Sequence, residues 1–196
     1  MNDFNKATTK APNPQGKGLV PVLAALSAAS YRNIALPKQV EQIASELFTS
    51  MFVLESSFGF KPVKGKAYWL YRSNNRYKLS LLSPQQWSAA VFGDVIGQCV
   101  LHEDLTWTLE LGDEAVNDSG FMAYIAERRR LFGEELQGAD SVDDLLPVFQ
   151  ESLPFYQRVF ASAMAGSLGH SMQLSGIKGL SYEQARGLLT ADAGEP

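Results

Sequence analysis

Apolar residues recur at helical spacing between Pro37 and Gly59, and the chain then changes to alternating positions. The helical set consists of Val40, Ile43, Ala44, Leu47, Met51 and Leu54. This spacing places the set on one face of a helix, and Pro37 suits the first turn because its missing N–H would be unbonded there anyway. Phe48 and Phe52 widen the apolar face, so we expect this helix to lie on a sheet.

The stretch 65–87 predicts a β-hairpin followed by a short helix. Its first strand has Ala67, Trp69 and Tyr71 on one face and Tyr68 and Leu70 on the other, and its second strand contains Tyr77, Leu79 and Leu81. Residues 73–75 (Ser-Asn-Asn) supply the turn, because Asn tolerates positive φ. Ser83 and Pro84 then start a helix that returns Trp87 and Val91 to the sheet.

Residues 95–111 alternate apolar and polar positions, which predicts two further strands or one long strand bent at 102–104. Beyond Gly112 the pattern changes to helices. Their expected starts are Asp118 or Ser119, Ser141, Pro154 and Ser181. The sequence therefore predicts an α+β fold, in which a small antiparallel sheet of about three to four strands packs with an amphipathic helix and a mostly helical C-terminal half follows.

These patterns divide the chain into four parts. We expect a flexible N-terminal arm at 1–18, an α+β core at 19–112, a helical half at 113–190 and a tail at 191–196. Charge supports the division at residue 112, because residues 1–112 carry 11 Lys and Arg against 8 Asp and Glu, whereas the rest carries 6 against 13.

Composition indicates an ordinary cytoplasmic domain. The 196 residues are 45% hydrophobic, enough for a core of their own. The single cysteine, Cys99, excludes an internal disulfide. The apolar run Leu19–Ser30 follows a polar leader and contains Pro21, unlike a signal peptide, and no apolar stretch approaches the ~20 residues of a membrane span. We therefore expect a cytoplasmic protein with no membrane partner.

Between Glu55 and Asp94 the sequence has no acidic residue, and its cations alternate with aromatics there. Such a surface suits polyanions, because cations pair with phosphates or carboxylates and exposed aromatics stack on bases. Four readings stay open: single-stranded nucleic acid, an acidic protein partner, the chain's own acidic half, or no binding role, since lysines also protect exposed edge strands. The predicted binding residues are Lys61, Lys64, Lys66, Trp69, Tyr71, Arg72, Arg76 and Lys78. If Trp69 instead belongs to the core, its replacement by alanine costs ~3–5 kcal/mol.

Three motifs carry a resemblance to a known family. They are Tyr68, Leu70 and Tyr71 in a Y-x-L-Y strand, Ser83, Pro84 and Trp87 in an S-P-x-x-W helix start, and Asp104 to Thr108 in a D-L-[ST]-W-T strand. In this order they resemble the uncharacterised family called domain of unknown function 2452. Eukaryotic members have Pro-Gly where this chain has Lys64-Gly65, and an acid where it has Gln86. The family has no established activity, so the resemblance implies no functional residues.

A second candidate site lies at His102, Glu103 and Asp104, where a base and two carboxylates are adjacent. Adjacent strand residues point to opposite faces, so these groups reach one substrate atom only if the chain bulges. A polar turn is the favoured reading, and an enzyme of unknown class with these weak catalytic candidates is the alternative. With two His and one Cys the sequence predicts no metal site, and with no glycine-rich fingerprint it predicts no cofactor.

Two features of the C-terminal half have alternative readings. The run Arg128-Arg129-Arg130 spans most of a helix circumference, which favours an ion-paired solvent face over a phosphate site. Small residues recur along the predicted helix 155–172, namely Ala161, Ser162, Ala165, Gly166 and Gly169. They predict a close helix contact inside the fold, or a homodimer through this helix.

Overall fold

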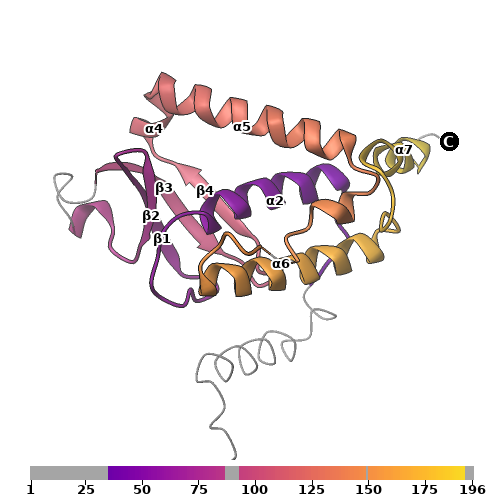
Figure 1. The fold of residues 1–196 in the computed structure, drawn as a ribbon, viewed down its shortest axis with the longest axis horizontal. Coiled ribbons are helices and arrows are strands. Elements are labelled where there is room, and N and C mark those ends of the chain that lie inside the picture. Colours follow the sequence, from indigo (N-terminus) through magenta and orange to yellow (C-terminus); the bar gives the residue numbers. More distant parts are fainter. Residues whose placement is uncertain (1–34, 87–92, 149, 193–196) are drawn as a thin grey trace, which may run out of the picture.

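The computed structural model describes residues 35–86, 93–148 and 150–192. It shows an α+β fold, in which a four-stranded antiparallel sheet packs with one helix and a mainly helical part follows (Figure 1). The predicted fold class is therefore confirmed. In chain order, the elements are α2 (Val40–Leu54), β1 (Ala67–Ser73), β2 (Arg76–Ser80), the 3-10 turn η2 (Pro84–Gln86), β3 (Asp94–Leu101), β4 (Trp107–Leu111), α4 (Asp113–Asn117), α5 (Ser119–Gly138), the 3-10 turn η3 (Val142–Leu145), α6 (Phe155–Leu174) and α7 (Tyr182–Asp192). The predicted arm 1–18 and the end of the predicted tail lie outside the described residues, as do Trp87 and Val91.

The sheet has the strand order β2-β1-β3-β4, and each neighbouring pair is antiparallel. The predicted hairpin is β1 and β2, and its turn contains Asn74 at φ 49° and Asn75 at φ 60°. Both values lie in the left-handed region that a two-residue hairpin turn requires. The stretch 95–111 forms two strands rather than one bent strand, because the chain turns back after Leu101.

The two faces of the sheet differ in exposure. Tyr68, Leu70, Leu79, Cys99, Leu101 and Trp107 lie on the inner face and join Ile43, Leu47 and Val53 of α2 in the core. Apart from the buried Tyr71 and Ser80, the outer face carries half-buried or exposed side chains, among them Ala67, Trp69, Lys78, Gln98, Val100, Thr108 and Glu110. An antiparallel sheet of this kind buries one face and leaves the other to solvent.

Hydrogen bonds to α2 and to the segment after it hold both outermost strands. The amide of Ser57 donates to the carbonyl of Tyr77 at 2.9 Å, and the amide of Leu79 donates to the carbonyl of Ser57 at 3.1 Å, so Ser57 lies along the free side of β2. On β4, the amide of Trp107 donates to the hydroxyl of Ser50 at 2.8 Å. These bonds fix α2 on the inner face.

The helix α2 begins at Val40, later than the predicted start at Pro37. Ser175 explains the difference, because its hydroxyl accepts from the Lys38 amide and donates to the Lys38 carbonyl, both at 2.8 Å. The carbonyl that would accept an early helical bond thus accepts from Ser175, the C-cap residue of α6, instead.

The predicted helix starts at Asp118 or Ser119, Pro154 and Ser181 are confirmed, whereas at Ser141 the chain forms only the 3-10 turn η3. Asp118 caps α5 by accepting from the Phe121 amide at 3.0 Å, and Ser141 and Asp144 form a capping box at η3. The short helix α4 was not predicted. None of the helices in the described part of the chain has the length and apolar composition that a membrane span requires.

Two of the three arginines of the run on α5 are ion-paired, as predicted for the run. Arg128 lies 2.8 Å from Glu55, and Arg130 pairs with Glu127 at 2.7 Å and with Glu134. Arg129 lies over the ring of Phe48, 5.1 Å from its centroid. Arg128 and Arg129 therefore connect α5 to α2 and its C-cap Glu55, whereas Arg130 pairs within α5.

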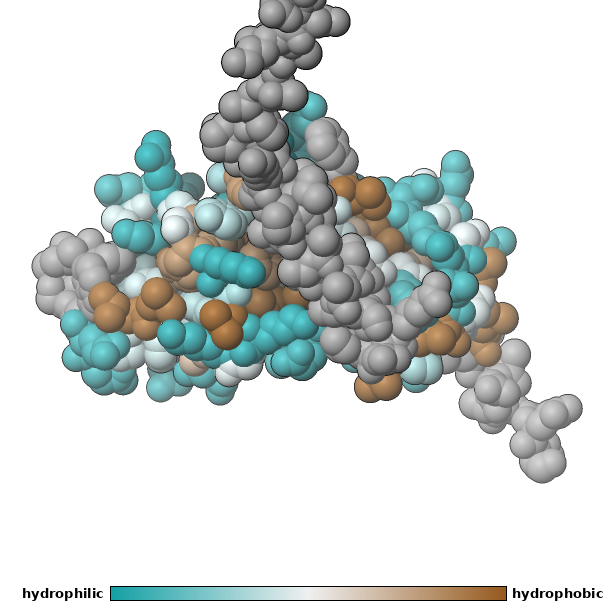
Figure 2. All heavy atoms as spheres, turned by 90° about the horizontal axis from the view of Figure 1, so that it is seen from below, coloured by the Kyte–Doolittle hydropathy of each residue, from teal (hydrophilic) through white to brown (hydrophobic). Residues whose placement is uncertain are grey.

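The small residues of α6 serve packing inside the fold. Ala161 and Ala165 are buried, whereas Gly166 is exposed. On the lower side of the molecule, where α6 lies in Figure 1, apolar and hydrophilic side chains are interspersed over the visible surface (Figure 2). The homodimer through 155–172 stays a prediction.

Candidate functional site

The predicted binding residues of the basic stretch lie in three places. Lys61, Lys64 and Lys66 belong to the loop before β1, at the end of the sheet where β3 turns into β4. There the amide of Gly65 donates to the carbonyl of Leu101 at 2.7 Å. The ammonium of Lys64 lies 3.3 Å from a carboxylate oxygen of Glu103, so the chain itself supplies an anion to this lysine.

Arg72 lies on the inner face, away from the other cations. It shares the face of Tyr68 and Leu70 because strand residues alternate, and its guanidinium reaches Asp94 at 2.9 Å and Asp118 at 2.6 Å. The hydrogen bonds that Arg72 donates to Asp118 and Asp94 raise its pKa. Asp118 belongs to the acidic half, so here one of the open readings applies: the acidic half binds a hairpin cation.

Trp69, Arg76 and Lys78 lie on the outer face and form what we call the outer-face cluster. The register of β1 and β2 sets this arrangement, because it pairs Trp69 with Ser80 and Tyr71 with Lys78. Trp69 is half-buried, and Arg76 and Lys78 are exposed. Trp69 therefore does not belong to the core.

Tyr71 shares the outer side of β1 but is not available as an exposed aromatic. It is only 2% exposed, and its hydroxyl donates to the carbonyl of Leu82 at 2.8 Å. Burial raises the pKa of Tyr71. Of the predicted binding aromatics, Trp69 alone offers a partly exposed ring.

His102, Glu103 and Asp104 of the β3–β4 turn line one surface hollow, but their polar groups make separate contacts. His102 Nε2 lies 3.0 Å from the hydroxyl of Thr108, and Glu103 contacts Lys64. Asp104 contacts Lys38 and accepts from the hydroxyl of Thr106 at 2.7 Å. Each group of the second candidate site is thus held by a different partner.

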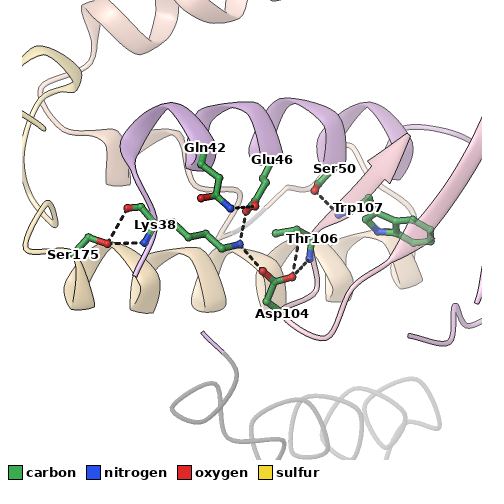
Figure 3. A network of polar contacts seen from close by, with 8 residues as sticks. All are labelled: Lys38, Gln42, Glu46, Ser50, Asp104, Thr106, Trp107 and Ser175. Carbon is green, nitrogen blue, oxygen red and sulfur yellow. Dashed lines mark hydrogen bonds and ion pairs between the residues drawn. The ribbon is translucent and has the colours of Figure 1, made fainter. Parts of the chain in front are cut away.

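Lys38, Glu46 and Asp104 form a half-buried ionic group that sequence reasoning missed; we call it the Lys38 cluster (Figure 3). The ammonium lies 2.5 Å from an oxygen of each carboxylate, and its side chain is 8% exposed. Gln42 also donates to Glu46, at 2.9 Å. The cluster joins α2 to the turn between β3 and β4.

The Lys38 cluster holds its groups charged. Burial alone would raise the pKa of Asp104, but hydrogen bonds from Lys38 and Thr106 lower it below its usual value. Burial would likewise lower the pKa of Lys38, but the two carboxylates raise it. A surface hollow of about 460 Å³ lies beside the cluster and is lined by Lys38, Gln42, Glu46, His102, Asp104 and Thr108, among others. Because the carboxylates are already bonded, the cluster serves the fold.

The thiol of Cys99 is protected by the core. It lies on the inner face, and burial raises its pKa to about 12. No group of three or more His, Cys, Asp and Glu in the described residues is arranged to hold a metal ion.

We expect Cys99 to be unreactive while the protein is folded, because only the thiolate attacks disulfide reagents and both access and ionisation are suppressed. The measurement is labelling by an aromatic disulfide at pH 8, first in buffer and then in guanidinium chloride. One thiol should react only after unfolding, since the chain has a single cysteine. Full labelling within minutes in buffer would contradict the buried placement.

Two of the three sequence motifs have complete places in the fold, and of the third the structure describes Ser83 and Pro84 at η2 but not Trp87. Tyr68 is buried, with its hydroxyl accepting from the Val63 amide at 2.7 Å, and Asp104 and Trp107 hold the turn and the core. Residues 30–121 match the model of the family DUF2452, protein of unknown function. The resemblance to that family is confirmed for this part of the chain.

The DUF2452 match extends from before α2 through the sheet and α4 to Phe121. Phe121 is the residue whose ring lies under Arg72, 5.6 Å from centroid to guanidinium carbon. The match thus passes the boundary expected at residue 112 and includes the N-terminus of α5. No curated protein and no solved structure matches the chain.

Proposed function

We propose that the chain is a binding protein that holds a negatively charged partner on the outer face of its sheet. The observation that carries the proposal is the outer-face cluster, in which a half-buried tryptophan lies beside two exposed cations. Tryptophan and arginine are the side chains that most often dominate binding energy, because each combines a large contact area with a polar group.

The inner face and the paired cations support this choice of surface. Packing accounts for the inner aromatics, and Asp94 and Asp118 account for Arg72. Arg76 lies opposite Ser73 at the hairpin end and is exposed. In the described part of the chain no carboxylate forms an ion pair with it, unlike Arg72. Arg76 is therefore an exposed cation with no internal carboxylate to account for it in the described residues, and it lies on the same face as Trp69.

Reversing the two charges tests the proposal. In the double variant Arg76→Glu, Lys78→Glu, we expect affinity for an anionic matrix to fall at least about tenfold, which corresponds to ~1.4 kcal/mol. The measurement is the retention of the full chain on polyglutamate and on single-stranded oligonucleotide matrices over a salt series, since ionic contacts weaken with salt.

Lys178→Glu is the matched control, because Lys178 is an exposed lysine in the turn between α6 and α7. It changes the net charge without touching the sheet, so its retention should fall much less. Equal losses in Lys178→Glu and in a single Lys78→Glu variant, or no retention of the parent chain at low salt, would overturn the proposal.

A further inference from the structure

Resting on this proposed function, we infer that the partner is an acidic polypeptide segment in extended conformation, with one apolar residue followed at alternate positions by two carboxylates. The outer-face cluster has a linear arrangement that such a segment matches. Its apolar residue contacts Trp69, and its carboxylates contact Lys78 and Arg76 in turn.

Strand geometry sets the spacing. Trp69 pairs with Ser80, so Lys78 is its diagonal neighbour on β2, at roughly 7–8 Å between Cα atoms. Arg76 follows two residues along the same strand, about 6.6–6.8 Å further. Alternate residues of an extended peptide have this same separation, so three of its side chains on one side reach all three members of the cluster.

Charge on the rest of the outer face favours a segment whose acids are confined to one end. Trp69 pairs with Gln98 on β3, and Gln98 pairs with Glu110 on β4. The exposed carboxylate of Glu110 is thus two strands from Trp69, about 10 Å. A partner that continues past Trp69 with negatively charged residues is repelled by this carboxylate. An apolar end carries no charge and is not repelled.

The same face is a poor match for single-stranded nucleic acid. Such binding uses successive aromatic platforms along a cationic groove. Here Tyr71 is buried and bonded to Leu82, which leaves the one partly exposed ring of Trp69 on the described hairpin strands' outer face. The chain also has a net charge of −4, which repels a long polyanion.

Three fluorescent probes test the inference with the full chain. The first is a peptide with the pattern apolar–Ser–Glu–Ser–Glu. The second has the same composition in the order apolar–Ser–Ser–Glu–Glu, so that its glutamates are adjacent and do not have the inferred spacing. The third is a single-stranded oligothymidine. Fluorescence anisotropy at low salt gives each Kd. We expect the patterned peptide to bind at least about tenfold more tightly than the shuffled peptide and the oligonucleotide.

Variants assign the contacts. Trp69→Ala should weaken the patterned peptide about tenfold while Trp69→Phe retains most of the affinity, because phenylalanine still offers an aromatic face. Arg76→Glu should also weaken it, and Lys178→Glu should not. Circular dichroism of each variant identifies any loss of affinity that comes from unfolding. If Trp69→Ala does not fold, the comparison of Trp69→Phe with Arg76→Glu still tests the contacts.

The outcomes separate the inference from the function on which it rests. If both peptides bind equally and the double variant Arg76→Glu, Lys78→Glu abolishes binding of both, the inferred spacing is wrong and the proposed anion-binding surface stands. If the oligonucleotide binds more tightly than the patterned peptide, the partner class is wrong. If none of the probes binds, both the inference and the proposed function are overturned.

Discussion

Replacing Trp107 by alanine is expected to lower the free energy of unfolding by ~3–5 kcal/mol, the range for a large aromatic in a packed core. Trp107 is 1% exposed at the start of β4, and its ring packs against Tyr68 at 5.7 Å between centroids. Its removal leaves a cavity between the sheet and α2, because hydrogen bonds with Ser50 and Ser57 hold β4 and β2 in place. Urea unfolding followed by far-ultraviolet circular dichroism gives the value.

Trp107→Phe is the matched control. The indole Nε1 of Trp107 has no hydrogen-bond partner although it is buried. Phenylalanine removes this unpaired N–H and keeps most of the apolar contact, so the loss should be less than half that of alanine. Equal losses in the two variants, or a loss below ~1 kcal/mol for alanine, would contradict the core placement.

Replacing Lys38 by methionine is expected to cost about 3 kcal/mol, because it leaves two poorly exposed carboxylates without their cation. Glu46 and Asp104 are 21% and 16% exposed, so water only partly compensates. The triple variant Lys38→Met, Glu46→Gln, Asp104→Asn removes all charge and should recover much of the stability. A triple variant less stable than Lys38→Met would contradict the ionic explanation.

The cost of Lys38→Met should depend on pH. The pKa of Asp104 is lowered in the folded protein. The carboxylate's contribution to the free energy of unfolding is therefore present above the unfolded pKa of ~4 and is lost as pH falls through the pKa of the folded state. The pKa of Lys38 is raised, so its contribution is lost only when pH rises above ~10. Unfolding of parent and variant at pH 7 and pH 3 should therefore show a smaller difference at pH 3.

Local patterns predicted the elements well, because helical spacing, the Asn-Asn turn and the caps at Asp118 and Ser141 depend on neighbouring residues. The family resemblance was also readable, since its motifs are short. What the sequence could not decide was which face of β1 is inner, as aromatics occur on both. Trp69 was open to a core reading for this reason, whereas the structure places it on the outer face.

The candidate site was less predictable because it depends on pairing between distant residues. A run of cations in sequence suggests one surface, but alternation along β1 sends Arg72 to the inner face, where Asp118 lies 46 residues away in sequence. Lys38 and Asp104 are 66 residues apart, and nothing local connects them. Only the register of β1 and β2 brings Trp69, Lys78 and Arg76 together.

The contact of Ser57 with β2 limits how copies of this protein can associate. An unpaired strand at the border of a sheet is a template on which another molecule can add its own strand, which leads to aggregation. Because Ser57 already takes the Tyr77 carbonyl and the Leu79 amide, β2 offers little of that template. A partner on the outer face can therefore lie beside β2 without the sheets of two molecules fusing into one.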